Sequence, residues 1–438
     1  MKQEVTLGLV CLARKTFDFE AAAKIYSNII NDLDEIENVK WVKIPDLIIE
    51  ITEAQEAARY ISSKGVDAII CISGTFALGH LVLELNKIIN KPILLWALEE
   101  LPYDGGKIRL NSVCGVNLNA SNLYKSGVTN YRINIGDKID HNWIDAIRVM
   151  KVLYSSHIGI IGYRAKGFFN LDVDELNLYK ELGILVDHYE LQELFEFEID
   201  GKEIDLRKEN LKEIFDLNNV TDEQVNLVAE LIVKLDKFLS YHNIDALAIR
   251  CWPEFADKFG ISPCAAMSLL QSEHKILTCE GDILGAVSML SHRAIGASYP
   301  FMADFSQVDF KDNYALLWHC GVAPCNLTDG KCVRSLDPYF AGGKGVTADF
   351  VMKSGEISIL RFDYALGNYR LFLQKATGIP MDKLLKGTYV KVKFEKGVKK
   401  VLHDIINNGI AHHVSVVYGD FIKPFEIFAQ IKGWNVIQ

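Results

Sequence analysis

The sequence has few of the features that nucleic-acid-binding proteins require. Its 438 residues include 47 Lys and Arg against 57 Asp and Glu, giving a net charge of −10, and the chain contains no basic run. Duplex nucleic acid is bound mainly through Lys and Arg on its phosphates, so we expect no nucleic-acid partner. A composition of 49% hydrophobic and 24% charged residues is typical of a globular protein and argues against disorder. Small molecules and other subunits remain as partners.

Signals for export and for membrane insertion are also missing. Residues 1–20 place Glu4 and Arg14 around a short apolar run without a small-residue cleavage site, which predicts a first β-strand and no signal peptide. The most apolar longer stretch, 66–85, is interrupted by Asp67 and by glycines, so it favours a strand, a turn and a helix over a membrane span. We therefore expect a cytoplasmic protein that does not associate with membranes.

Neither the cysteines nor the glycines form a recognised motif. The nine cysteines are an odd number, and the loose group over 320–332 contains no CxxC pair. We therefore expect reduced thiols, with a metal role for that group as the alternative. The glycine segments 159–162 and 342–345 lack the spacings of nucleotide-binding loops. No GxSxG elbow is present, so a serine hydrolase has no support.

Two stretches of the chain alternate apolar strands with helical segments. In residues 1–151 the strand candidates are 5–13, 39–48, 66–73 and 91–98. In residues 152–298 the candidates include a strand that runs into a glycine-containing loop over 157–170, and strands at 183–191 and 244–255. Strands that are apolar on both faces and joined by helices indicate a parallel sheet covered on each side. Residues 299–438 instead contain short strands separated by Gly, Asp or Asn turns, typical of an antiparallel barrel or sandwich. We predict two α/β domains, 1–151 and 152–298, followed by a β-rich domain, 299–438.

Several residues that can carry chemistry lie near the ends of predicted strands. Glu280 follows the apolar run KILTC, where a parallel sheet presents side chains to a ligand, and Asp304 lies among aromatic residues. His319 lies in an apolar strand, and His412 and His413 begin another, in which only one of the two can face the same interior. Carboxylates and imidazoles suit Mn²⁺, Mg²⁺ or Co²⁺ better than thiolate-bound zinc.

Each of these residues also has a purely structural interpretation. Glu280 and Asp282 could stabilise a helix N-terminus, Asp304 could belong to a turn, and His319 could be a hydrogen-bonded core residue. Taken together, four such groups at the exits of strands favour a metal site.

Six segments resemble the L-fucose isomerase and L-arabinose isomerase superfamily in their order and separations. They are GYRAKGFFNLDVDEL, IRCWPEFADKFGISPC, CEGDILGAVSML, FMADF, LWHCG and GIAHHVSVVYGD. The resemblance covers roughly residues 155–325, with the N-terminal domain and the His-His strand in register. It implies two Rossmann-like parallel-sheet domains and a C-terminal antiparallel β-barrel-like domain. It also implies a Mn²⁺-dependent aldose–ketose isomerase acting through a cis-enediol, with no organic cofactor.

The resemblance also implies roles for single residues. Glu280 and Asp304 would be the catalytic carboxylates and, with His319 and His413, the metal ligands. Asp304 matches the fucose-type acid and His319 the arabinose-type histidine, which leaves L-fucose, D-arabinose, L-arabinose or a modified hexose carrying an anionic group, such as a sulfonated one, as the sugar. Four residues are candidates for contacts with the sugar, with a structural role as the alternative for the first three: Arg14, Arg250, Trp252 and His412.

Members of the resembled family cover the sugar with the N-terminal domain of a neighbouring subunit. We therefore expect a homo-oligomer, with a hexamer favoured, in which Arg14 reaches into the adjacent site. An enediol needs such a cover because water would divert the intermediate into side reactions. Because fold alone does not give function, two alternatives stay open. They are a non-catalytic sugar-binding protein and another metal-dependent sugar enzyme such as an epimerase.

Overall fold

The computed structural model describes residues 2–438, which divide into two compact units. The N-terminal unit contains the described residues up to Lys151 together with Lys423–Trp434, and the C-terminal unit contains Val152–Ile422 and Asn435–Gln438. Each unit is described by itself, and the predicted division into three domains stays a prediction.

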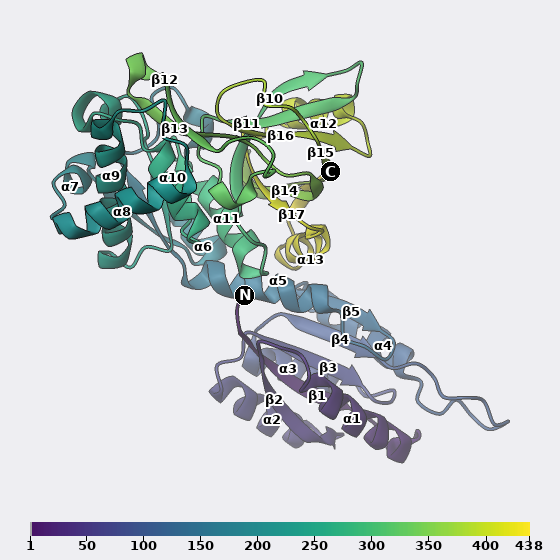
Figure 1. Ribbon diagram of the computed structural model, residues 1–438. Coiled ribbons are helices and arrows are strands. Elements are labelled where there is room, and N and C mark those ends of the chain that lie inside the picture. Colours follow the sequence, from purple (N-terminus) through teal and green to yellow (C-terminus); the bar gives the residue numbers. More distant parts are fainter. Residues whose placement is uncertain (1) are drawn as a thin grey trace. The chain divides into compact units, whose positions relative to one another are not determined.

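A five-stranded parallel sheet forms the centre of the N-terminal unit (Figure 1). In spatial order its strands are β2 (Val39–Ile48), β1 (Val5–Leu12), β3 (Ala68–Ser73), β4 (Ile93–Ala97) and β5 (Tyr131–Ile135). Strands β3 and β4 are buried along their whole length, as continuous apolar runs in a parallel sheet predict.

Helices follow the strands of this sheet in alternation. They are α1 (Phe19–Leu33), α2 (Ile51–Ser63), α3 (His80–Ile89), α4 (Ser112–Lys125) and α5 (His141–Ser155). Helices α2, α3 and α4 pack their apolar residues into one core with β1, β3 and β4. The sequence sets the start of α1 through Asp18, whose carboxylate accepts the amide hydrogen of Ala21, and the start of α2 through a capping box of Glu50 and Glu53.

The C-terminal unit begins with a four-stranded parallel sheet. Its spatial order is β7 (Leu185–Tyr189), β6 (His157–Ile161), β8 (Ala246–Ile249) and β9 (Leu277–Cys279). The helices of this part are α6 (Glu175–Leu182), α7 (Leu191–Phe195), α8 (Gly201–Ile214), α9 (Asp222–Tyr241), α10 (Cys264–Ser272) and α11 (Ile283–Ala294). None of the helices within residues 2–438 has both the length and the apolar character that crossing a membrane requires.

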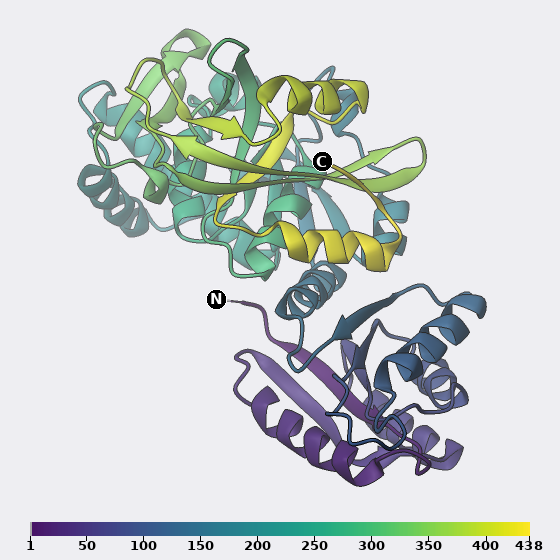
Figure 2. The same ribbon diagram turned by 90° about the vertical axis from the view of Figure 1, so that its right-hand side faces the viewer.

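A closed antiparallel barrel of six strands completes the C-terminal unit (Figure 2, green to yellow). Around the barrel the strands are β16 (Thr388–Phe394), β11 (Tyr314–His319), β10 (Phe301–Asp309), β17 (His413–Tyr418), β14 (Gly355–Ala365) and β15 (Asn368–Ile379). Pairing of β15 with β16 closes the ring and so decides between the barrel and the sandwich. The predicted fold class, two parallel-sheet α/β parts and an antiparallel barrel, is confirmed.

Strands β12 (Ser335–Phe340), β13 (Gly345–Val351) and β18 (Asn435–Ile437) extend the sheet of the barrel, and helix α12 (Val398–Asn407) contacts β16. Helix α13 (Ile422–Lys432) lies almost wholly in the segment that belongs to the N-terminal unit. Helix α11 contacts β8 of the parallel sheet and β14 and β17 of the barrel. Its N-terminus therefore lies where the sheet meets the barrel, and the candidate site is built there.

Candidate active site

The first candidate carboxylate is held by a tight turn between β9 and α11. Glu280 follows the last residue of β9 and has a φ of 63°, a left-handed conformation that is uncommon for a residue with a side chain. Gly281 continues the turn at a φ of 74°, and a Cβ there would lie 2.6 Å from Cα of Arg164. Asp282 then caps α11 by accepting the amide hydrogen of Gly285 at 2.8 Å. Glu280 is thus fixed between a buried strand and a capped helix.

Three neighbouring barrel strands supply the second carboxylate and two imidazoles. Asp304 on β10 lies opposite His413 on β17, and His319 ends β11 on the other side of β10. The Nε2 atom of His413 lies 3.6 Å from Oδ1 of Asp304 and 3.3 Å from Oε2 of Glu280. The structure therefore brings together the four residues that the sequence analysis named as metal ligands.

Unsatisfied polar atoms mark the centre of this cluster. Among the described residues, Oδ1 of Asp304, Nε2 of His319 and Nε2 of His413 are buried without a hydrogen-bond partner. Buried polar atoms are normally satisfied, so three orphaned atoms in one place need an explanation. The same three residues bring one possible ligand atom each to within 4.8 Å of the others, and a second such group joins Glu280 to His412 and His413. This donor set fits a divalent cation that prefers oxygen and nitrogen.

His413 has the surroundings expected of a metal-binding histidine. Its Nδ1 lies 2.9 Å from Oδ2 of Asp282, and the fully buried Asp282 also pairs with the fully buried guanidinium of Arg361. Burial alone would lower the pKa of His413, but the hydrogen bond with Asp282 and the nearby carboxylate of Glu280 raise it to about 10. A carboxylate that accepts the Nδ1 proton orients the ring and leaves Nε2 to the cation, which would take the place of a proton.

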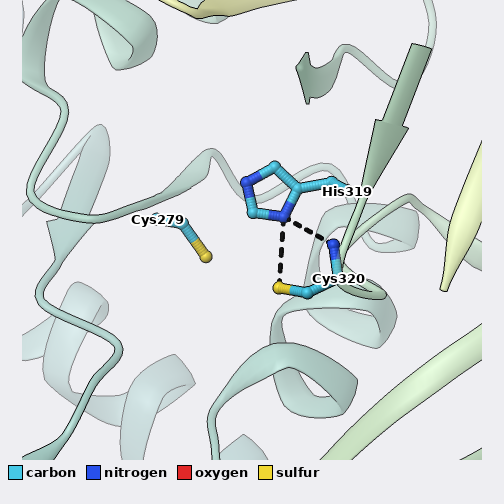
Figure 3. A group of neighbouring side chains, drawn as sticks. All are labelled: Cys279, His319 and Cys320. Carbon is cyan, nitrogen blue, oxygen red and sulfur yellow. Dashed lines mark hydrogen bonds between the residues drawn. The ribbon is translucent and has the colours of Figure 1, made fainter. Parts of the chain in front are cut away.

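His319 has different surroundings, which Figure 3 shows. Its Nδ1 accepts the amide hydrogen of Cys320 at 2.9 Å and lies 3.2 Å from Sγ of the same cysteine. Burial lowers the pKa of His319 and so favours the neutral ring. A neutral ring that accepts at Nδ1 carries its proton on Nε2, which makes that atom a donor. Coordination through Nε2 would require the proton to move to Nδ1, so the ligand role of His319 stays a prediction.

Both histidines of the pair reach Glu280. Nε2 of His412 lies 3.3 Å from Oε2 of Glu280, and the ring of Phe168 packs edge-on against His412. Strand β17 begins only at His413, so the alternation of side chains along a strand does not extend to His412. Burial alone would raise the pKa of Glu280, but the hydrogen bond with His412 and the nearby imidazole of His413 lower it to about 2. Glu280 is therefore a carboxylate at neutral pH.

A cavity of about 640 Å³ opens onto this cluster. Glu280, Asp304 and His319 line it together with Trp252 and Trp318. The cavity therefore offers carboxylates, an imidazole and aromatic rings, and the ring of Trp318 stacks beside His319.

Neither of the two predicted sugar-contacting arginines is among the residues that line this cavity. Arg250 is not among the lining residues and pairs with Glu254 at 2.9 Å. Arg14 lies in the N-terminal unit, where its amide donates to Oγ1 of Thr75 at 2.7 Å. The substrate contacts proposed for Arg14 and Arg250 stay predictions.

Sequence reasoning missed part of the site. It assigned Asp282 only to a helix N-terminus, whereas this residue caps α11 and also holds His413. Arg361 lies on β14, distant in sequence, and only the closed barrel brings it to Asp282. The position of Asp282, two residues after Glu280, was the one signal for this role in the sequence. A buried acid at the end of a strand needs a cationic or hydrogen-bonding partner.

Comparisons with known proteins agree with this architecture. Residues 8–141 match the family model described as fucose/sulfoquinovose isomerase, N-terminal domain. A sulfoquinovose isomerase from Priestia aryabhattai is 28% identical over 437 residues and aligns over 95% of each chain. The resemblance to the fucose isomerase family is confirmed. A sulfoquinovose isomerase from Alkalicoccus urumqiensis is 26% identical over 451 residues, covering 99% of each chain.

The same relatives confirm the predicted enzyme class, an aldose–ketose isomerase. Among solved structures, a periplasmic solute-binding protein from Actinobacillus succinogenes with bound D-allose aligns at a TM-score of 0.17 and 10% identity, covering 62% of this chain and 83% of that chain. That similarity is too low to support an argument about this chain.

Proposed function

We propose that the chain is a metal-dependent aldose–ketose isomerase that converts sulfoquinovose, a hexose with a sulfonate at C6, through a cis-enediol. The observation that carries the proposal is the convergence of Glu280, Asp304 and His413 at 3.3 and 3.6 Å beside a 640 Å³ cavity. The names of the relatives supply the choice of sugar among those that the sequence left open.

The proposed cation is Mn²⁺, with Mg²⁺ or Co²⁺ as possible substitutes. Glu280, Asp304 and His413 would hold it, with His319 as the predicted fourth ligand. When bound, the cation would polarise two adjacent sugar oxygens and stabilise the negative charge of the enediol. No organic cofactor is needed for this chemistry.

The protein residues would move the proton. Isomerisation transfers a hydrogen from C2 to C1, so it needs a base at carbon and an acid at the carbonyl oxygen. Glu280 is ionised at neutral pH and is our candidate for the base at C2. Asp304 borders the same cavity and is our candidate for the second acid–base group. As the alternative to coordinating the cation, a neutral His319 ring with its proton on Nε2 could donate to a sugar oxygen.

The sulfonate at C6, remote from the reacting carbons C1 and C2, needs a cationic or hydrogen-bonding partner. Among the described residues that line the cavity none is Lys or Arg, whereas Trp252 and Trp318 supply aromatic surface. We therefore keep the proposal that Arg14 of a neighbouring subunit meets the sulfonate in a cytoplasmic homo-oligomer, with a hexamer favoured. Arg250 and His412 remain candidates for polar contacts with the sugar from within the C-terminal unit.

An aldose panel tests the proposed function. Purified protein would be stripped of metal with a chelator and assayed for ketose formation from sulfoquinovose, glucose, L-fucose, D-arabinose and L-arabinose. We expect turnover of sulfoquinovose above the other sugars, loss of turnover without metal, and better recovery with Mn²⁺ than with Ca²⁺ because compact octahedral geometry is needed. Full activity of metal-free protein would overturn the metal dependence. Melting shifts with sugars but no ketose would indicate a binding protein.

A further inference from the structure

Four cysteines from four different elements gather beside His319. They are Cys251 after β8, Cys264 at the start of α10, Cys279 at the end of β9 and Cys320 after β11. Sγ of Cys320 lies 3.5 Å from Sγ of Cys264 and 3.2 Å from Nδ1 of His319. Ligand atoms of Cys279, His319 and Cys320 all lie within 4.8 Å of one another (Figure 3). These side chains are distant in sequence, and their spacing contains no CxxC motif that would predict a shared site.

We propose that Cys264, Cys279, Cys320 and Nδ1 of His319 form a second cation site, for a thiophilic divalent cation of the zinc class. A tetrahedral zinc ion with bonds of about 2.3 Å to sulfur and 2.0 Å to nitrogen holds its ligand atoms about 3.6–3.8 Å apart. The two distances of 3.5 and 3.2 Å are already close to that spacing. Small side-chain movements would therefore suffice to complete the site.

The two cation sites differ in the atoms that they offer. Oxygen atoms of Glu280 and Asp304 with Nε2 of His413 suit Mn²⁺ or Mg²⁺, whereas thiolates select zinc-class cations. His319 belongs to both sets, since it groups with Asp304 and His413 and also with Cys279 and Cys320, and its Nδ1 lies 3.2 Å from Sγ of Cys320. The Nδ1 lone pair accepts the Cys320 amide hydrogen, so it already faces the thiols. Binding would transfer this lone pair from the amide to the cation.

The thiol site has an entrance. Cys251, Cys264 and Cys320 line the same 640 Å³ cavity as Glu280 and Asp304. A cation that enters the cavity therefore reaches the thiols without opening the core. Occupation of the thiol site would fix the orientation of the His319 ring.

Cobalt is a suitable probe, because Co²⁺ bound to thiolates absorbs in the near ultraviolet through sulfur-to-metal charge transfer. Reduced, metal-free full-length protein would be titrated with Co²⁺ and then with Zn²⁺. We expect a charge-transfer band that saturates at one thiolate-bound cobalt per chain and disappears when Zn²⁺ displaces it. Cys279→Ser and Cys320→Ser should each lose the band. The matched control Cys325→Ser, a buried cysteine outside the cluster, should keep it.

A further variant separates this inference from the proposed isomerase. Asp304→Asn removes an oxygen ligand of the first site, so the charge-transfer band should remain even if isomerase activity is lost. Failure of the aldose panel would leave the cobalt result unaffected. Absence of the band in folded wild-type protein, or its persistence in the Cys279→Ser and Cys320→Ser double variant, would overturn the thiol site.

A measurement on the wild-type protein covers the case in which the serine variants do not fold. Alkylation with iodoacetamide, followed by mass spectrometry, would compare Cys320 with the exposed Cys114 in the presence and absence of Zn²⁺. We expect one equivalent of Zn²⁺ to slow modification of Cys320 at least tenfold and to leave Cys114 unchanged. Equal rates at Cys320 with and without Zn²⁺ would contradict the proposal.

Discussion

Glu280 combines an unusual backbone with a chemically useful side chain. Its φ of 63° costs free energy, typically about 1–3 kcal/mol for a non-glycine residue, and such conformations persist where the surrounding structure enforces them. Here β9 on one side and the Asp282 cap of α11 on the other enforce it. The carboxylate then contacts both His412 and His413. A strained residue that holds an ionised carboxylate at a cavity is a strong candidate for a catalytic base.

The first prediction tests this role. Glu280→Gln keeps the size of the side chain and removes the base, so turnover of the preferred aldose should fall by about 10²–10⁴. Asp257→Asn is the matched control, because Asp257 is an exposed carboxylate that lines the same cavity. Initial rates of ketose formation at saturating sugar and Mn²⁺ check the prediction. An equal loss in both variants, or normal turnover in Glu280→Gln, would contradict the assigned role.

The second prediction separates the two buried histidines. His413 donates Nδ1–H to Asp282, whereas Nδ1 of His319 accepts the Cys320 amide. We therefore expect His413→Ala to weaken Mn²⁺ binding at least tenfold and His319→Ala to weaken it less. Equilibrium dialysis with metal analysis measures both values, with His412→Ala as the neighbouring control. An equal loss in His319→Ala would show coordination through Nε2, and a loss in His412→Ala alone would exclude His413.

Single residues could be selected from the sequence, but their supporting contacts could not. Glu280, Asp304 and the His412–His413 pair were recognisable as ionisable groups beside apolar strands, the family resemblance favoured His413 of the pair, and the structure brings Glu280, Asp304 and His413 together. The Asp282–Arg361 pair was not recognisable, since it depends on β14 entering the barrel beside α11. The cysteine cluster was missed for the same reason, because its members come from four elements.

At the scale of elements, α11 has the most constrained position. Almost every residue from Ile283 to Ala294 is buried, since the helix contacts both the parallel sheet and the barrel. A histidine in this helix, His292, is fully buried and its Nδ1 lies 2.9 Å from Oγ of Ser415 on β17. Burial lowers the pKa of His292 to about 3.

The third prediction follows from this lowered pKa. Between pH 6.5 and 3 the unfolded chain binds a proton at His292 that the folded chain does not, so stability falls as the pH falls through this window. The expected slope is about 1.4 kcal/mol per pH unit well below pH 6.5. Wild-type protein should therefore lose about 1.5 kcal/mol more unfolding free energy than His292→Asn between pH 6.5 and 5. Urea unfolding measures the difference.

An exposed histidine provides the control for this measurement. His403 lies on the solvent side of α12, so His403→Asn should follow the wild-type pH dependence. A His292→Asn variant with the same acid dependence as wild-type protein would show that His292 becomes protonated without unfolding.

Local sequence patterns predicted the strands of the barrel but not their closure into a ring. Turn residues and short apolar runs predicted the strands after residue 298, yet barrel and sandwich both remained open. The decision lies in the pairing of β15 with β16 at Ala376–Phe394, a contact between strands that also pair with other partners. Such closure depends on the register of all six strands together, which no local pattern contains.

For the whole molecule, the sequence supported the fold class but not the assembly. Apolar runs joined by helices predicted two parallel sheets because a strand covered on both faces has no polar side, and both sheets are parallel in the structure. The division into three domains and the oligomeric state depend on contacts between parts of the chain and between subunits. These remain predictions.

The last prediction concerns the assembly. The oxygen and nitrogen cluster lies wholly within the C-terminal unit, whereas Arg14 lies in the N-terminal unit. If Arg14 of one subunit serves the cluster of its neighbour, Glu280→Gln and Arg14→Ala protomers should each be inactive alone.

Mixed oligomers would contain some sites with both intact halves, since closed cytoplasmic oligomers repeat one interface. For random mixing of equal amounts, about a quarter of the sites would be intact by this repeated-interface argument, so we expect roughly that fraction of wild-type turnover. Native mass spectrometry would confirm subunit exchange, and rates of ketose formation would measure the recovery. Full turnover by a monomer, or no recovery despite exchange, would rule out a shared site.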